Sequence, residues 1–332
     1  MSTNTESSFA SIALGAPQVH RNLVVFPIVT PPAKPAGWLT LGEALAQQLL
    51  TVTETSRGGS VPELSVINNA DQPVLLLDGE ELIGAKQNRV LNTTILLKER
   101  STTVIPVSCT EQGRWSYVSA AFSDSKAFLA HKIRARKSRS VSESLARAAG
   151  FKSDQGEVWE EIAALHGSAG TSSPTGAMAD AFKARERDLE ERLAAFPPVQ
   201  GQTGLLVVID DEVAGFDFIP HPEIYARQHA KLVKSYLIDS VGQRDPRPAN
   251  PETASTKAEQ FLKLASESPS RDFPSIGYGT ARRYQDSSQA GAALLHESEV
   301  VHAAFFNLPP EKRPAEDSMA PYLRRRRWHG EQ

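Results

Sequence analysis

The sequence has almost no cysteine, no long apolar run and no excess of either charge. Its single cysteine, Cys109, excludes a disulfide within the chain and gives no reason to expect an oxidising compartment. The longest uninterrupted apolar run, 205–209, is far shorter than the roughly 18 residues that a membrane helix needs. Residues 1–15 lack the basic start and the apolar stretch of a secretory signal. We therefore expect a cytoplasmic protein without a membrane segment.

Acidic and basic residues nearly cancel, with 36 Lys and Arg against 39 Asp and Glu in 332 residues. A pI of about 6.3 disfavours a dedicated nucleic-acid binder, whose domain pI usually exceeds about 9. Gly and Pro occur at ordinary frequencies, which excludes collagen-like and low-complexity classes. The partners that fit this composition are a small-molecule ligand and further copies of the chain in a homo-oligomer.

Short β-rich segments dominate the first part of the chain, and helical spacing follows. Their recurrence every 8–12 residues or so is typical of a sandwich or a barrel. We predict an α+β protein with an N-terminal antiparallel β domain, a helical middle and a C-terminal β-α layer. The predicted divisions are a flexible arm (1–19), the β domain (20–122), a helical segment (123–200), an α+β segment (201–310) and a charged tail (311–332).

Local signals predict where several elements begin and end. Thr40 followed by Glu43 has the spacing of a capping box, which opens a short helix. Apolar residues at helical spacing predict one helix within 126–149 and another over 178–196. The run 291–307 predicts one strand of a final pair.

Polar residues crowd the segment 78–94, which lies between two apolar strands. Lys86 and Arg89 have the chemistry to hold an anion. Asp78, Glu80 and Glu81 have the chemistry to hold a hard cation or to act as acids and bases. An internal ion-pair network that fixes a hairpin or a subunit contact explains the same residues, and both interpretations stay open.

A second polar cluster occupies 105–117. Glu111 and Arg114 are spaced to pair across a tight turn. Trp115 is suited to stack on a base or a sugar, although a strand tryptophan more often packs in a core. Cys109 has no histidine nearby in the sequence, so we interpret it as a small buried side chain rather than a nucleophile.

The basic run 132–139 admits two interpretations, contact with phosphates or a solvated helix face. No phosphate loop, dinucleotide fingerprint or nucleophile elbow occurs. His221 and His229 lack the spacing of a helical metal site. The sequence therefore predicts no metal site and identifies neither a cofactor nor a catalytic residue.

Three segments together resemble one family: 75–89 (LLLDGEELIGAKQNR), 105–115 (IPVSCTEQGRW) and 154–159 (DQGEVW). They are similar to the ARG- and rhodanese–phosphatase-superfamily-associated protein domain, a family of largely uncharacterised microbial proteins, over about residues 15–310. The family's association with ADP-ribosylglycohydrolases implies a role around ADP-ribose or nucleotide-derived phosphates.

The resemblance implies that the two polar motifs converge on one site. There the cations would contact phosphate, the acids would orient ribose hydroxyls or a metal, and in any turnover a carboxylate would activate water. The expected function is binding of a phosphate-bearing, nucleotide-derived small ligand such as ADP-ribose, and whether the ligand is also processed stays open. The alternative is a non-enzymatic scaffold whose polar motifs form a subunit interface. The expected ligand-binding residues are Asp78, Glu80, Lys86, Gln87, Asn88, Arg89, Glu111, Gln112, Arg114 and Trp115.

Overall fold

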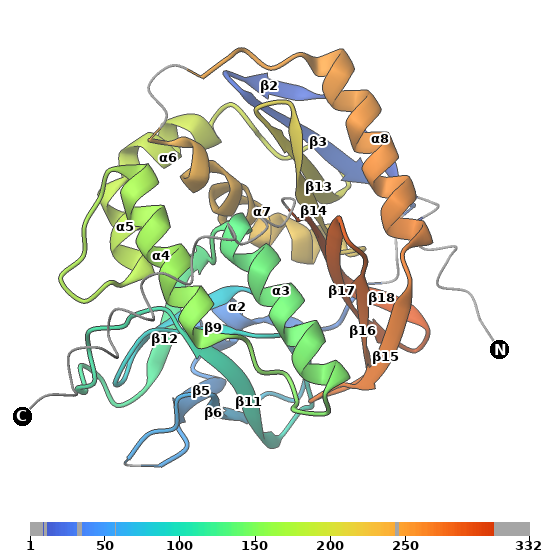
Figure 1. The fold of residues 1–332 in the computed structure, drawn as a ribbon. Coiled ribbons are helices and arrows are strands. Elements are labelled where there is room, and N and C mark those ends of the chain that lie inside the picture. The colour runs from blue at the N-terminus through green and yellow to red at the C-terminus, as the bar shows by residue number, and fades with distance from the viewer. Residues whose placement is uncertain (1–8, 10–11, 32–34, 57, 243–245, 309–332) are drawn as a thin grey trace, which may run out of the picture.

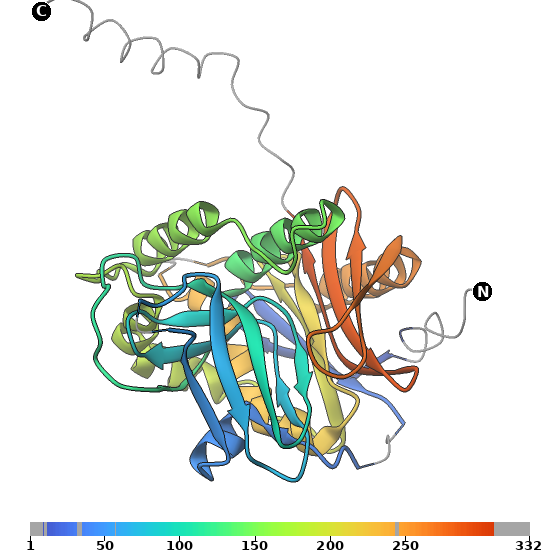
Figure 2. The ribbon, with the colours of Figure 1, turned by 90° about the horizontal axis from the view of Figure 1, so that it is seen from below.

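The computed structural model describes residue 9 and residues 12–31, 35–56, 58–242 and 246–308. Within these residues a large sheet and a smaller β body lie side by side, with helices packed against both (Figure 1, Figure 2). The predicted α+β class is confirmed. None of the described helices combines the length and the apolar character that crossing a bilayer requires.

The large sheet is antiparallel throughout. Alternate residues of its central strand belong to different cores, with Leu205 and Val207 on one face and Leu206 and Val208 on the other. A sheet covered on both faces explains why this strand is a continuous apolar run. In spatial order its strands are β1 (Ala13–Leu14), β3 (Leu23–Val29), β13 (Gln202–Ile209), β14 (Glu212–Phe218), β18 (Glu299–Asn307), β17 (Gln289–His296), β16 (Thr280–Gln285) and β15 (Ser270–Pro274), and β2 (Gln18–His20) also pairs with β3.

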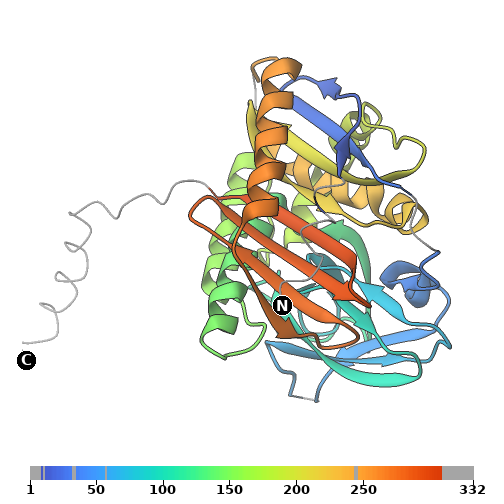
Figure 3. The ribbon, with the colours of Figure 1, turned by 90° about the vertical axis from the view of Figure 1, so that its right-hand side faces the viewer.

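Helices cover both faces of the large sheet. On one face α8 (Pro251–Glu267) lies across the strands, as Figure 3 shows. On the other face α3 (His131–Ala146) and α7 (Pro222–Leu237) separate the sheet from the smaller β body. These two central helices carry several of the charged side chains discussed below, among them Arg134, Lys137 and Lys231.

The smaller β body closes around a core of its own. Val66, Leu82 and Ile105 of its six-stranded sheet pack against Leu76 and Ile95 of a three-stranded sheet. The larger of these sheets curls and contains β12 (Phe122–Phe128), β8 (Glu80–Gly84), β9 (Arg89–Leu91), β11 (Ser101–Cys109), β6 (Glu63–Asn68) and β5 (Leu50–Glu54). The smaller contains β10 (Ile95–Leu97), β7 (Val74–Leu76) and β4 (Leu39–Thr40), of which β4 and β7 run parallel.

Capping residues position the remaining helices. The predicted capping box at Thr40 and Glu43 is present and opens α2 (Leu41–Ala46). The side chain of Asp154 accepts a hydrogen bond from the Glu157 amide at the start of α4. The other helical elements are α4 (Gln155–Ala169), α5 (Met178–Ala184), α6 (Glu186–Leu193) and the 3₁₀ turn η1 (Ile238–Ser240).

Several predicted elements differ from the structure. The first strand of the predicted β domain is β3, and it pairs with β13 in the large sheet. The predicted arm contains β1 and the start of β2, and both strands pair with β3. The helix expected within 126–149 begins only at His131, because the preceding residues complete β12. The predicted tail, 311–332, lies outside the described residues.

Two further predictions of single elements are wrong. The helix expected over 178–196 is interrupted at Arg185, whose φ of −109° and ψ of 13° depart from helical values. The strand expected over 291–307 folds back on itself at Glu297 and Ser298, which adopt φ values of 52° and 67°. Both turn residues lie in the left-handed region, and neither is a glycine or an asparagine that would have signalled the turn.

Candidate functional site

A buried ion pair joins α3 to the large sheet. Arg134 donates from Nη1 to Asp217 Oδ2 at 3.0 Å and from Nη2 to Oδ1 at 2.6 Å, and the Tyr236 hydroxyl donates to Oδ2 at 2.8 Å. Burial alone would raise the pKa of Asp217, but the Arg134 charge and hydrogen bonds from His302 and Arg134 hold it well below its usual range. Asp217 is therefore an ionised anchor inside the protein.

Two of the predicted ligand-binding residues also lie in interior ion pairs. Asp78 pairs with Lys137, whose ammonium also donates to the Leu91 carbonyl at 2.9 Å. Glu80 lies 3.0 Å from the Lys231 ammonium, and neither Asp78 nor Glu80 is open to solvent. Arg134 and Lys137 of the basic run are thus internal ion-pair partners, and not part of a solvated helix face.

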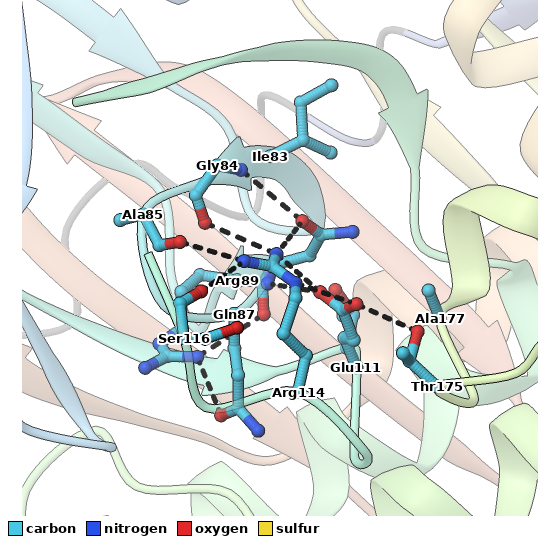
Figure 4. Close-up of polar contacts among 12 residues, drawn as sticks. Ile83, Gly84, Ala85, Gln87, Arg89, Glu111, Arg114, Ser116, Thr175 and Ala177 are labelled. Carbon is cyan, nitrogen blue, oxygen red and sulfur yellow. Dashed lines mark hydrogen bonds and ion pairs between the residues drawn. The ribbon is translucent and has the colours of Figure 1, made fainter. Parts of the chain in front are cut away.

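Figure 4 shows the network that holds the second polar motif in place. Arg114 donates to both carboxylate oxygens of Glu111, from Nε at 2.9 Å and from Nη2 at 2.6 Å. Its remaining donors reach the carbonyls of Ala85 and Ser116 and the side-chain oxygen of Asn88. All five N–H groups of Arg114 therefore have protein acceptors, and a phosphate would have to displace one of them.

The pKa of Glu111 follows from the same network. Burial would raise it, but hydrogen bonds from Arg114, from the Thr175 hydroxyl at 2.8 Å and from the Asn88 amide at 3.2 Å lower it. The loop after β11 is thereby fastened to the β8–β9 turn and to the segment before α5. This arrangement accounts for why the motif combines an acid, an amide and an arginine.

Arg89 lies beneath an aromatic cover. Its guanidinium is fully buried, donates to the Gln87 side chain at 3.1 Å and approaches Glu54 Oε1 at 3.6 Å. The Trp115 ring lies 5.7 Å from its central carbon. Lys86 lies beside the same tryptophan and is more accessible than Arg89. Its ammonium is 5.1 Å from the centre of the Trp115 ring.

The ten predicted residues therefore divide into three groups. The first group, Asp78 and Glu80, belongs to interior ion pairs. The second group is the hydrogen-bonded network around Arg114, which contains Glu111, Asn88, Arg89 and Gln87. The third, outer group contains Lys86, Gln112 and Trp115. Together with Tyr117 and Val118, which were not among the ten, it forms what we call the motif surface. That the ten residues bind a ligand stays a prediction.

A cavity lies away from the two polar motifs, beside the first two turns of α3. Its volume is about 570 Å³, and none of the ten predicted residues lines it. Four segments surround it: the start of α3, the β13–β14 turn, α4 with η1, and the end of β18. The lining residues are His131, Lys132, Ala135, Arg136, Glu161, Ile209, Asp210, Glu212, Val213, Ala214, Asp239 and Asn307.

Positive charge enters the cavity from α3. Ala130 precedes the helix and offers no capping side chain, and the first turn contains no acid, so its leading amides lack both usual forms of compensation. Lys132 is exposed, whereas Arg136 is held by Glu161, with 2.7 Å between Nε and Oε1. The first turn of α3 and Lys132 thus bring positive charge to a cavity that is also lined by the carboxylates of Glu161, Asp210, Glu212 and Asp239.

A histidine–aspartate pair forms one wall. The Nδ1 atom of His131 lies 2.7 Å from Oδ2 of Asp239, and the imidazole stacks on Tyr236 with ring centres 5.3 Å apart and planes 18° from parallel. Both contacts fix the ring, while the residue still lines the cavity. The Asp239 carboxylate lies beside Nδ1 without a hydrogen bond to it, and Nε2 is the ring nitrogen that a ligand or a water molecule would meet.

The sequence singled out two of the residues that line this cavity, without predicting a cavity there. Lys132 and Arg136 lie in the basic run that was considered for phosphate contact, but His131 and Asp239 were not singled out. Neither is in a recognisable motif, and only the fold brings them together. Among the described residues, no group of three or more His, Cys, Asp or Glu side chains is placed to hold a metal ion.

Comparison with known proteins identifies a family and no individual relative. The family model for the ARG and Rhodanese-Phosphatase-superfamily-associated Protein domain matches residues 11–306. No curated protein matches the chain, and no solved structure matches it. The match confirms the resemblance that the polar motifs indicated, and it includes the motif surface and every residue of the cavity lining except Asn307.

Proposed function

The chain belongs to the family of the ARG and Rhodanese-Phosphatase-superfamily-associated Protein domain, and we propose that it binds a phosphate-bearing, nucleotide-derived ligand such as ADP-ribose. The binding site in this proposal is the cavity beside α3. The observation that carries it is that α3, whose N-terminus has no side-chain cap, begins at the wall of a cavity of about 570 Å³. This volume is within the range of roughly 300–1,000 Å³ that is typical of small-ligand sites.

The phosphate groups would lie at the start of α3. Amides without intrahelical acceptors and the positive end of a helix dipole attract anions, and α3 is 16 residues long. Lys132 adds a mobile ammonium, and Arg136 adds a guanidinium oriented by Glu161. These groups supply complementary charge without any change in the backbone.

The sugar and the base would occupy the opposite wall. Asp210 and Glu212 provide carboxylate oxygens, which accept hydrogen bonds from ribose hydroxyls. Ile209, Val213 and Ala214 form an apolar strip beside them, suited to the face of a nucleobase. Phosphate affinity at one end and hydroxyl and base affinity at the other favour a nucleotide-derived ligand over inorganic phosphate.

Calorimetric titration of ADP-ribose into the purified chain tests this proposal. We expect Lys132→Ala to weaken binding by about 10-fold or more, because a hydrogen bond to a charged group contributes about 1.5–3 kcal/mol. Lys86→Ala, which removes an accessible lysine of the motif surface, is the matched control and should leave the affinity unchanged. Loss of binding in Lys86→Ala with none in Lys132→Ala would place the ligand at the predicted motifs instead.

A second candidate function is that of an interaction protein, and the motif surface favours it. Trp115, Tyr117 and Val118 are 47%, 50% and 66% exposed and follow closely along one loop. Large exposed side chains gathered in this way commonly mark protein interfaces. If this surface joins subunits, light scattering will give a mass above that of the monomer, and Trp115→Ser with Tyr117→Ser will return it to 36.1 kDa. A monomer at all concentrations in the wild-type chain would exclude such an interface.

A further inference from the structure

We propose that the cavity also catalyses a reaction: the hydrolysis of a phosphoanhydride bond in its ligand, with His131 as the general base. This inference rests on the proposed binding function and adds an activity to it. Three observations point to it together. They are the histidine–aspartate pair on the cavity wall, the stacked orientation of the imidazole, and the cations on the same helix.

His131 has the geometry of a catalytic base. Asp239 Oδ2 lies 2.7 Å from Nδ1, so a carboxylate stands beside the ring and stabilises the positive charge that the imidazole gains when Nε2 accepts a proton. Tyr236 stacks against one face of the ring and prevents it from turning. Asp239 is a positioning residue here, since it acts on the ligand only through the imidazole.

Neighbouring groups are arranged to stabilise negative charge. Lys132 and Arg136 follow His131 in the first two turns of α3 and line the same cavity. A phosphoryl group held by them would lie within reach of a water molecule next to the imidazole. Positive charge that already lines the cavity stabilises the additional negative charge that develops on the phosphoryl oxygens.

The step balances without a further reactant. The water oxygen forms a bond to phosphorus, His131 Nε2 accepts the proton of that water, and the bridging P–O bond breaks with its electron pair retained by the departing phosphate monoester. The proton on His131 then returns to solvent. A phosphate monoester is a stable anion and needs no general acid to leave, which suits a cavity wall with one imidazole base. From ADP-ribose the products are AMP and ribose 5-phosphate.

Phosphorus NMR of ADP-ribose incubated with the full chain tests the activity. We expect the pyrophosphate signals to disappear and two monoester signals to grow. His131→Ala should lower kcat by about 100-fold or more, the lower end of what a general base contributes, while calorimetry finds the affinity nearly unchanged. His296→Gln is the matched control, because this histidine lies outside the cavity and should leave turnover intact.

Chemical rescue separates catalysis from folding. Added imidazole should restore part of the turnover of His131→Ala and none of that of Lys132→Ala. Asp239→Asn should lower kcat with little change in KM, and Asp239→Glu should recover part of it. Binding of ADP-ribose without hydrolysis by the wild-type chain would overturn this inference and leave the proposed binding function standing. Release of free ADP instead of AMP would also overturn it, since that product requires a different bond to break.

Discussion

Glu81 provides a prediction whose size can be worked out from its surroundings. Its side chain is fully buried beside β11 and accepts a hydrogen bond from the Thr110 hydroxyl at 2.7 Å, and the Ser125 side chain also interacts with it. Burial raises the pKa of Glu81 from 4.5 to about 7, and the Thr110 hydrogen bond opposes only part of that rise. The folded protein therefore favours the protonated carboxyl, and ionising it at higher pH costs stability.

The sign and the magnitude follow from proton linkage. Because the folded pKa lies above the unfolded value, the stability contributed by protonated Glu81 is present below pH 4.5 and is lost as the pH rises through about 7. At about 1.36 kcal/mol for each tenfold change in the proton equilibrium, the full loss is about 3 kcal/mol. Glu81→Gln keeps the acceptor for Thr110 and removes the charge, so it should escape this loss.

Urea unfolding followed by tryptophan fluorescence at pH 5 and pH 8 measures the effect. The stability of Glu81→Gln relative to the wild type should increase by about 2 kcal/mol between the two pH values. Glu63→Gln, an exposed glutamate on β6, is the control and should show no such increase. The same relative stability at both pH values would refute the argument that burial holds Glu81 protonated.

Three further predictions concern stability and reactivity. Asp217→Asn should lower the free energy of unfolding in urea by about 3–5 kcal/mol, because it leaves Arg134 buried without its counterion. Asp71→Asn, which breaks an exposed ion pair, is the control and should have no measurable effect. Equal losses in the two variants would contradict the argument that burial makes the Arg134 pair important. Thr40→Ala should cost about 1 kcal/mol through loss of the helix cap, and a neutral result would show that α2 does not depend on it. Burial raises the pKa of Cys109 to about 11, so a thiol reagent should label it only after unfolding, and rapid labelling of the folded chain would show that the site opens.

Features that depend on neighbours in the sequence could be predicted from it. The capping interactions at Thr40 and Asp154 join residues three positions apart, and both are present. The α+β class followed from hydrophobic spacing, which is also a local property. The pairing of β3 with β13 could not be predicted, because the two strands lie far apart in the chain and no local signal selects a partner.

The same distinction applies to the candidate site. The motifs indicated that Glu111 and Arg114 act together, and they form a bidentate pair three positions apart. A lysine or an arginine of the basic run can face solvent, a ligand or the interior. Which of these it does depends on acids that lie far away in the sequence. Arg134 meets Asp217 after 83 positions and Lys137 meets Asp78 after 59, so their burial became visible only in the folded chain.

The central claim is that the ligand lies in the cavity beside α3, and a crystal structure of the chain with ADP-ribose tests it most directly. The account predicts electron density for the diphosphate against Lys132 and the first turn of α3, with the ribose toward Asp210 and the imidazole of His131 facing the phosphorus. Density at Trp115 and Lys86 of the motif surface, with the cavity beside α3 containing only water, would contradict it.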